Sequence, residues 1–200
     1  MSTTFYLVRH AKKEKGIGDV SITLEGLSEA QKTASHLRNV QLSQIVCSPL
    51  NRAKQTARII AESINKTIAE DSRLRERANW GDLPGQTFQE FVAMWDRCTK
   101  EREFTPQVGD SARSAGERLA SCLQELSVQY PHESIVIVTH GGLITDFMVN
   151  VCSEIELTEW NSNFVSEQSN LVAECSITKV IYRNGAVELV DFANTAHLYD

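Results

Sequence analysis

No Cys-x-x-Cys pair occurs in this sequence of 200 residues, and its five cysteines are odd in number and widely spread. This pattern excludes both a disulfide framework and a zinc knuckle. No carboxylate cluster of the kind that holds magnesium is evident either. We therefore expect the cysteines to be small buried residues, and we expect a protein that uses no metal and no cofactor.

Long apolar runs and long basic runs are also absent. No window approaches eighteen uninterrupted apolar residues, and the start of the chain, "MSTTFYLVRH", lacks the basic and then apolar regions of a secretion signal. The net charge is −6, and no stripe of lysine and arginine is interleaved with aromatic residues. We predict a cytoplasmic protein that binds neither membranes nor nucleic acid, in which any cationic site is local.

The composition is that of an ordinary globular protein. The chain is 42% hydrophobic and 23% charged, with no low-complexity tract and no repeat. A chain of this length can bury roughly 70% of its unfolded surface and needs no cross-link to fold. We predict a single domain over residues 1–200.

Apolar periodicity predicts strands that alternate with helices. The expected strands are Thr4–Val8, Gln44–Cys47, a short one within residues 66–71, Ile135–Val138, and a hairpin over residues 175–192 with its turn at Asn184-Gly185. The expected helices cover residues 23–38, 48–64, 88–98, 114–130 and the segment after His140. Ser48 is the expected N-cap of the second helix, with Pro49 as its first residue. The helix at 88–98 falls in an expected insertion at about 80–110.

This order of elements predicts an α/β protein with three layers, α/β/α, around a mostly parallel central sheet. The run Ile135–Val138 is β-branched throughout, which is typical of a strand buried on both faces. Sheets of this kind bind ligands beyond the carboxyl ends of their strands. Residues that directly follow a strand are therefore the candidates for a functional site.

Two histidines occupy such positions. His10 and His140 each follow an expected strand, and parallel strands bring their carboxyl ends together although 130 residues separate the two. Taken alone, either histidine is better explained as a polar residue that closes a strand. Arg9 precedes His10, and Arg52 lies in the first turn of a helix that begins at a third strand end. Two guanidinium groups, an imidazole and helix amides together suit a tetrahedral dianion such as a phosphoryl group. No Walker-type or Gly-x-Gly-x-x-Gly loop indicates a nucleotide.

Six blocks of the sequence resemble a known family. They are "LVRHA", Thr23-Leu24-Glu25-Gly26, "SPLNRAKQTA", "LRERANWGDLPG", "VTHGGLI" and "NTAHL". In their order and spacing, over nearly the whole chain, they resemble the histidine phosphatase superfamily with its phosphoglycerate mutase-like fold.

The resemblance implies roles for individual residues. His10 matches the histidine that becomes phosphorylated, Arg9 and Arg52 match the arginines that hold the phosphoryl oxygens, and His140 matches the second histidine of the pocket. Glu76 matches the usual proton donor. Thr23 and Gly141 fall in matched blocks and are expected to contact the substrate.

These residue types fit the chemistry of phosphoryl transfer. A neutral imidazole is a competent nucleophile near pH 7 when one ring nitrogen is held as a donor and the other presents its lone pair. Arginines neutralise the charge on the phosphoryl oxygens. A carboxylic acid can protonate the leaving alkoxide and then accept a proton from water. Glu76 is our choice for this acid, and the alternatives in nearby loops are Glu14, Asp19, Glu25 and Asp82.

The sequence departs from the family pattern after the Arg-His pair. Ala11 replaces the usual glycine, and Lys12 and Lys13 replace residues that are commonly an acid and a hydroxyl. The two lysines either belong to a solvated loop or bind a second anionic group of a substrate that has more than one. Trp80, at the expected pocket rim, is either a packed aromatic or a substrate contact.

The resulting hypothesis is a phosphomonoesterase that forms a phosphohistidine on His10. Its substrate is a small phosphate ester or a phosphoprotein, and the sequence leaves the oligomeric state open. The chain is shorter than the cofactor-dependent mutases of the family, which makes a phosphoglycerate mutase the alternative. A non-catalytic binding module with the same fold is a further alternative, although all five candidate site residues are present.

Overall fold

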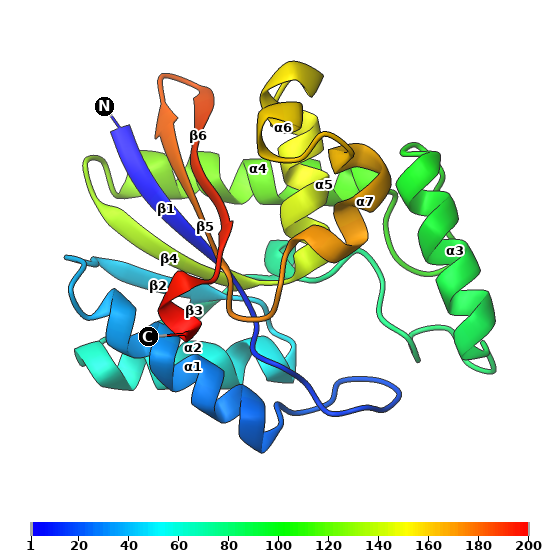
Figure 1. Cartoon of the computed structure of the whole chain (residues 1–200), viewed down its shortest axis with the longest axis horizontal. Coiled ribbons are helices and arrows are strands. Elements are labelled where there is room, and N and C mark those ends of the chain that lie inside the picture. Colours follow the sequence, from blue (N-terminus) through cyan, green and yellow to red (C-terminus); the bar gives the residue numbers. More distant parts are fainter. Residues whose placement is uncertain (1, 200) are drawn as a thin grey trace.

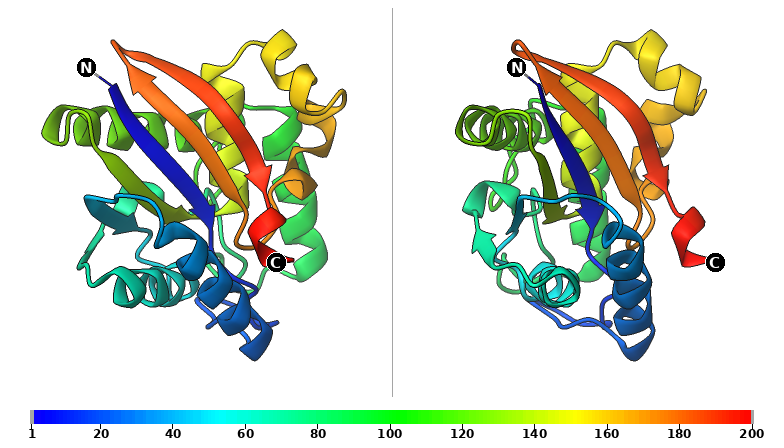
Figure 2. Two further views of the ribbon diagram at one scale, coloured as in Figure 1. Left: turned by 60° about the vertical axis from the view of Figure 1, so that its left-hand side comes forward. Right: turned by 90° about the vertical axis from the view of Figure 1, so that its left-hand side faces the viewer.

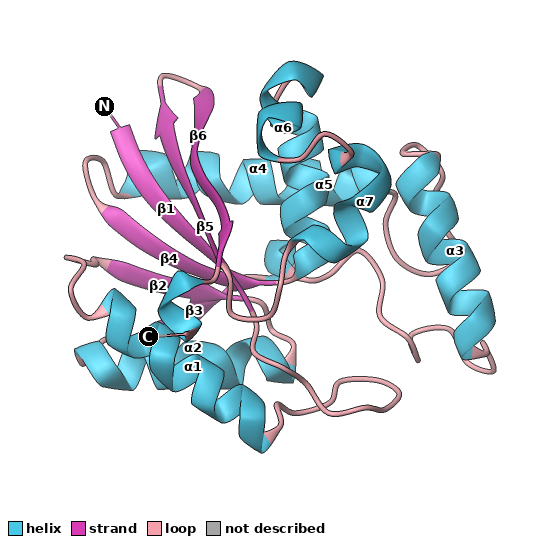
Figure 3. Ribbon diagram, in the orientation of Figure 1, coloured by secondary structure: helices cyan, strands magenta, loops and turns pink. Residues whose placement is uncertain are grey.

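The computed structural model describes residues 2–199, which form one six-stranded sheet covered by helices on both faces (Figures 1 and 3). The strands are β1 (Ser2–Arg9), β2 (Gln44–Cys47), β3 (Ile68–Glu70), β4 (Ser134–Thr139), β5 (Ile177–Arg183) and β6 (Ala186–Asn194). The helices are α1 (Leu24–Leu37), α2 (Asn51–Ile64), α3 (Phe88–Lys100), α4 (Ala112–Gln129), α5 (Gly141–Val151), α6 (Glu154–Trp160) and α7 (Phe164–Leu171). Two short 3-10 helices, η1 (Ser72–Leu74) and η2 (Ala196–Leu198), complete the elements.

The sheet has the strand order β3-β2-β4-β1-β5-β6. The first four strands in this order are parallel to one another. Strand β5 is antiparallel to β1, and β6 is antiparallel to β5, so that β5 and β6 form the hairpin at one edge. Its turn is at Asn184-Gly185, where both residues have positive φ angles of 51° and 84°. The predicted α/β fold with a mostly parallel sheet is confirmed.

The three layers follow from the alternation of side chains in β4. Ile135 and Ile137 point to one face, where they pack with residues of α4 and α5. Val136 and Val138 point to the other face, where they pack with α1 and α2. Because successive side chains of a strand lie on opposite faces, a strand of β-branched residues supplies both cores at once. Figure 2 shows the helices on either side of the sheet.

Strand register brings the predicted site together. Arg9 of β1 lies opposite Thr139 of β4, so His10 and His140 follow at adjacent carboxyl ends. The backbone N–H of His10 donates to the carbonyl of Thr139 over 2.9 Å. On the other side of β4, the N–H of Ser48 donates to the carbonyl of Val138, also over 2.9 Å. The carboxyl ends of β1, β2 and β4 therefore lie next to one another.

The predicted start of α2 was wrong. The helix begins at Asn51 rather than at Pro49, and its N-cap residue is Leu50, which makes no side-chain cap. The hydroxyl of Ser48 lies 2.8 Å from His140 instead. The first amide of the helix, that of Asn51, donates to the carboxylate of Asp19 over 2.7 Å, so a distant loop caps this helix.

Helix α3 lies beside the three layers rather than on the sheet (Figure 1). It falls within the segment predicted as an insertion. A capping box begins it, in which the Thr87 hydroxyl accepts from the Glu90 amide and the Glu90 carboxylate accepts from Thr87. Two short helices that we had not predicted, α6 and α7, connect α5 to the hairpin.

The structure also describes the state of the cysteines and the length and polarity of the helices within residues 2–199. All five cysteines are unbridged, and burial raises the pKa of Cys47, Cys122 and Cys175 to about 12. Over the same residues, every helix is too short or too polar to cross a membrane.

Candidate active site

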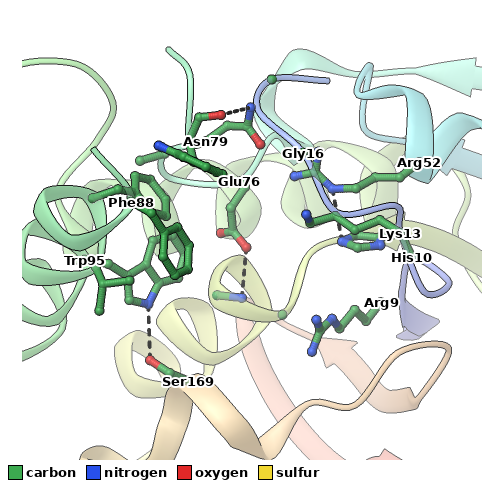
Figure 4. Close-up of a pocket in the computed structure, with 17 residues that line it drawn as sticks. Arg9, His10, Lys13, Gly16, Arg52, Glu76, Asn79, Phe88, Trp95 and Ser169 are labelled. Atoms are coloured by element: carbon green, nitrogen blue, oxygen red, sulfur yellow. Dashed lines mark hydrogen bonds between the residues drawn. The ribbon is translucent and has the colours of Figure 1, made fainter. Parts of the chain in front are cut away.

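A cavity of about 440 Å³ opens at the carboxyl ends of β1, β2 and β4, between the sheet and α3 (Figure 4). Its size is that of a small-molecule site. It is lined by Arg9, His10, Lys13, Gly16, Gly18, Arg52, Glu76, Ala78, Asn79, Trp80, Phe88, Phe91, Val92, Trp95, Gly141, Gly142 and Ser169.

Hydrogen bonds fix the imidazole of His10. Its Nδ1 lies 2.8 Å from the carbonyl oxygen of Ala11, and a carbonyl can only accept, so Nδ1 carries the proton. Nε2 then presents a lone pair, which accepts a hydrogen bond from Nε of Arg52 over 3.1 Å. The ring is therefore held in the tautomer and orientation that a nucleophile needs.

Electrostatics keep this imidazole neutral. The pKa of His10 lies well below its usual value, first because the ring is buried and then because Arg52 and Arg9 disfavour a second positive charge. The hydrogen bond to Ala11 acts in the opposite direction but does not prevail. At neutral pH the lone pair on Nε2 is consequently free of a proton.

The two arginines are held from different sides of the sheet. Arg52 is 3% exposed and comes from the first turn of α2. Arg9 is fixed from the segment before β5, because Nη1 donates to the carbonyl of Val172 over 2.5 Å and Nη2 pairs with Glu174 over 2.6 Å. Nε of Arg9 and Nη1 of Arg52 are buried without a hydrogen-bond partner among the described residues. Unpartnered buried donors of this kind suit an anionic ligand.

His140 lies beside His10, with ring centroids 5.2 Å apart in an edge-to-face arrangement. It is fully buried, and burial together with Arg52 places its pKa well below the usual value. Its Nε2 is 2.8 Å from the hydroxyl of Ser48, whereas Nδ1 has no partner among the described residues.

Ser48 is a site residue that the sequence analysis assigned to a helix cap. Its hydroxyl holds the orientation of His140. The signal for this role was present in the sequence, since Ser48 follows β2 as His10 follows β1 and His140 follows β4.

Glu76 lies between the two ends of the cavity (Figure 4). One carboxylate oxygen accepts from the amide of Arg77 over 3.0 Å, and the other accepts from the amide of Gly142 over 3.1 Å. Gly142 is required here, because a Cβ at this position would lie 2.8 Å from the Glu76 carboxylate and 2.6 Å from the ring of Trp95. The turn into α5 thus positions the carboxyl group of Glu76 directly.

The alternative acids do not line the cavity, although the carboxylate of Asp19 lies 3.9 Å from Nη1 of Arg52. Glu25 pairs with Lys12, Asp82 accepts from the amide of Asn79 over 3.2 Å, and Asp19 caps α2. Among the described residues that line the cavity, Glu76 is the one carboxylate.

The predicted substrate-binding residues divide into two groups. Lys13 and Gly141 line the cavity with Arg9 and Arg52, and burial and the two arginines lower the pKa of Lys13. Lys12 is turned outward onto Glu25, and Thr23 caps α1 by accepting from the amide of Gly26 over 2.9 Å. The structure therefore does not bring Lys12 or Thr23 to the cavity.

Apolar side chains form the wall opposite His10, most of them on α3. They are Trp80, Phe88, Phe91, Val92 and Trp95, and we refer to them as the aromatic wall. Trp80 packs edge-to-face on Phe88 with centroids 5.0 Å apart, so it is both a packed aromatic and a rim residue. Of these residues, the sequence pattern indicates only Trp80 as part of a pocket rim, because the apolar face of α3 is that of an ordinary amphipathic helix.

A buried ion pair attaches the aromatic wall to the rest of the protein. Arg77 is 2% exposed, and its Nη1 lies 3.0 Å and 3.1 Å from the two carboxylate oxygens of Asp146 on α5. The same guanidinium lies 3.7 Å from the ring centroid of Trp95 and donates to the hydroxyl of Thr99 over 2.6 Å. Burial raises the pKa of Asp146 to about 7 despite the neighbouring Arg77 and Arg102.

The chain is similar to known proteins over most of its length. Residues 5–195 match the model of the histidine phosphatase superfamily (branch 1). The chain is 26% identical to the uncharacterized phosphatase PhoE of Bacillus subtilis, over 98% of this chain and 97% of that protein. It is 30% identical to the probable phosphoglycerate mutase GpmB of Yersinia pestis, over 68% of each.

Solved structures resemble it as well. A phosphoserine phosphatase mutant of Entamoeba histolytica, in complex with phosphoserine, superposes with a TM-score of 0.75 at 26% identity, over 98% of this chain and 99% of that chain. The same enzyme has been solved in complex with 3-phosphoglyceric acid.

Proposed function

The chain belongs to the histidine phosphatase superfamily, and we propose that it hydrolyses phosphate monoesters through a phosphohistidine on Nε2 of His10. The observation that carries the proposal is the hydrogen bond from Nδ1 of His10 to the Ala11 carbonyl. It leaves the lone pair of a neutral imidazole beside two arginines in a cavity of small-molecule size. That size favours a small ester over a phosphoprotein. The cytoplasmic location stays a prediction.

In the first step, Nε2 of His10 attacks phosphorus as the bond to the leaving oxygen breaks. Arg9 and Arg52 neutralise the charge on the three equatorial oxygens, which is the main task in phosphoryl transfer. Nε of Arg52 exchanges its hydrogen bond to His10 for one to a phosphoryl oxygen. His140 supplies a further donor. The protonated carboxyl of Glu76 gives its proton to the leaving oxygen, and the alcohol departs.

In the second step, water attacks the phosphohistidine. The Glu76 carboxylate accepts a proton from that water as its oxygen bonds to phosphorus, and the bond between phosphorus and Nε2 breaks. Inorganic phosphate leaves, and His10 returns to its neutral form, with Nδ1–H still donating to the Ala11 carbonyl. Glu76 ends the cycle protonated, as it began.

Trapping the intermediate tests this proposal. An aryl phosphate has a good leaving group and needs little help from the acid in the first step. The variant Glu76→Gln should therefore still be phosphorylated by 4-nitrophenyl phosphate but should hydrolyse its phosphoenzyme slowly. Rapid quench into alkali, followed by mass spectrometry, should locate an acid-labile phosphoryl group on His10.

Two further variants serve as controls. His10→Ala should give neither turnover nor phosphoenzyme, and Asp82→Asn should trap no intermediate because that carboxylate lies outside the cavity lining. A phosphoryl group on a serine or on His140, or full activity of His10→Ala, would reject the mechanism. Full activity of Glu76→Gln would reject the acid assignment alone.

A phosphoglycerate mutase is the second candidate, and the similarity to a relative named as a probable mutase favours it. The two differ in the acceptor of the phosphoryl group. With 3-phosphoglycerate as substrate, a phosphatase releases inorganic phosphate, whereas a mutase yields the 2-phospho isomer. A non-catalytic module would bind phosphate and turn over neither this ester nor an aryl phosphate.

A further inference from the structure

We propose that the preferred substrate is a phosphate monoester whose alcohol portion is uncharged and apolar, with an aromatic or bulky hydrocarbon group that packs on the aromatic wall. This inference rests on the proposed function. It concerns the end of the same cavity that is far from His10, and it states the chemical character of the alcohol portion of the substrate.

The cavity has two chemically different ends (Figure 4). The cationic side chains in its lining are Arg9, Lys13 and Arg52, and all three lie at the His10 end. Phe88 and Trp95 lie at the opposite end, with Glu76 between. A phosphoryl group held at His10 therefore points its ester oxygen toward Glu76 and the remainder of the alcohol toward the aromatic wall.

The aromatic wall exposes apolar surface that the fold itself does not cover. Phe88 is 52% exposed and Val92 is 39% exposed. Both belong to a well-formed helix, since α3 begins with a capping box. Helix α3 lies beside the layers (Figure 1). Its apolar face therefore has no sheet to pack on, and Phe88, Val92 and Trp95 line the cavity instead. Contiguous exposed apolar groups within a concave site indicate a ligand of matching character.

The aromatic wall is also held in place before any ligand arrives. The indole of Trp95 lies on the guanidinium of Arg77 at 3.7 Å, and its Nε1 donates to the hydroxyl of Ser169 over 3.2 Å. The Nε1 of Trp80 donates to the carbonyl of Gln86 over 3.1 Å. Both indole N–H groups are therefore used within the protein, and what the rings offer a ligand is chiefly apolar surface. A pre-ordered wall loses little conformational entropy on binding.

A second anionic group on the alcohol would be poorly served here. Lys12, which we had considered as a partner for such a group, is ion-paired with Glu25 outside the cavity. Lys13 lies at the phosphoryl end. Toward the aromatic wall the polar lining residues are uncharged, namely Asn79 and Ser169, and the guanidinium of Arg77 behind Trp95 is already paired with Asp146. A carboxylate in this region would lose hydration without a cation among the lining residues to pair with.

A comparison of three esters tests the inference. Ethyl phosphate and 2-phenylethyl phosphate are both esters of primary alcohols of similar acidity, so they differ mainly in the apolar group. 3-Phosphoglycerate adds a carboxylate instead. We expect kcat/KM for 2-phenylethyl phosphate to exceed that for ethyl phosphate by about ten-fold or more, in line with the discrimination that hydrophobic pockets achieve. We expect 3-phosphoglycerate to be no better than ethyl phosphate.

Variants of the aromatic wall connect the preference to its residues. Phe88→Ala should lower the ratio of kcat/KM for 2-phenylethyl over ethyl phosphate by about three-fold or more. Val92→Thr keeps the shape of the side chain but replaces one methyl group by a hydroxyl, so it should lower the same ratio without disturbing the fold. Trp160→Ala is the matched control, because Trp160 is an aromatic residue of α6 that is 42% exposed and lies outside the cavity lining. It should leave the ratio unchanged.

The outcomes separate this inference from the function on which it rests. A preference for 2-phenylethyl phosphate that both wall variants reduce supports it. Equal kcat/KM for the two neutral esters, a preference for 3-phosphoglycerate, or a ratio that neither wall variant changes overturns it while the phosphatase activity stands. If none of the esters, nor 4-nitrophenyl phosphate, is hydrolysed, the proposed function itself fails.

Discussion

Nε of Arg52 donates a hydrogen bond to Nε2 of His10, so in the free protein the lone pair of the proposed nucleophile is occupied by the arginine that we propose to bind the phosphoryl group. The contact holds both side chains ready in one geometry. Substrate binding then has to redirect a single hydrogen bond, from the imidazole to a phosphoryl oxygen.

Arg52→Lys should lower kcat/KM for any phosphate ester by about a hundred-fold or more. A lysine keeps the charge but loses the planar fork that reaches the imidazole and the phosphoryl oxygens together. Steady-state kinetics with 4-nitrophenyl phosphate measures this. Arg58→Lys, at an exposed position of the same helix, is the control and should behave as the wild type. Near-normal activity of Arg52→Lys would mean that the guanidinium does not act on the phosphoryl group.

Ser48→Ala should reduce kcat by about five- to twenty-fold with a smaller change in KM. The alanine leaves His140 without its 2.8 Å partner, so the ring can turn away from the phosphoryl position. Ser48 is a positioning residue, and Ser48→Cys should restore less activity than serine because a thiol is a weaker hydrogen-bond partner. A crystal structure of the alanine variant in which the His140 ring keeps its orientation would contradict this explanation.

Acid should destabilise the protein below about pH 6.5. Burial lowers the pKa of both His10 and His140 in the folded state, so the unfolded chain binds more protons as the pH falls. The free energy of unfolding is therefore highest above the ordinary pKa and decreases by up to about 1.4 kcal/mol per pH unit for each histidine. Asp146 acts oppositely, because its raised pKa of about 7 makes the folded state the better proton binder as the pH falls through that value.

Urea denaturation at several pH values measures this dependence. His140→Asn removes one of the two buried imidazoles. On the acid side, the slope of the free energy of unfolding against pH should therefore decrease by about the contribution of one proton. An identical slope in the wild type and the variant would show that His140 does not contribute.

Asp146→Ala should destabilise the fold by about 3 kcal/mol, since it leaves the guanidinium of Arg77 buried without its partner. The double variant with Arg77→Ala should cost much less than the sum of the two single changes. The exposed pair of Arg97 and Glu101 at the end of α3 provides the control, and Glu101→Gln should change stability by less than about 0.5 kcal/mol. Chemical denaturation measures all four variants, and additive effects at Arg77 and Asp146 would contradict direct coupling.

Exhaustive treatment with EDTA should leave activity unchanged. In the proposed mechanism Arg9 and Arg52 supply the charge that a metal ion would otherwise provide. Within residues 2–199 the structure contains no group of three or more histidine, cysteine, aspartate or glutamate residues placed to hold a metal ion. Activity that is lost on chelation and restored by a divalent cation would refute this prediction.

The sequence alone determined the sheet and the convergence of the two histidines. The β-branched run of β4 required a strand buried on both faces, and alternation with helices required parallel neighbours. Parallel strands end at one edge, so His10 and His140 had to meet once β1 and β4 were adjacent. These conclusions depend on local periodicity and chain connectivity, both of which can be read along the sequence.

Only the tertiary structure decided what surrounds the histidines. Ser48 looked like a helix cap until the register of β2 and β4 placed its hydroxyl on His140. Lys12 and Lys13 are adjacent in sequence, yet one faces Glu25 and the other the cavity. The position of α3 depends on Arg77, which joins it to Asp146 of α5, 69 residues further along the chain. Side-chain directions in loops and pairings between distant charges have no periodic signal, because they are set by the packing of elements against one another.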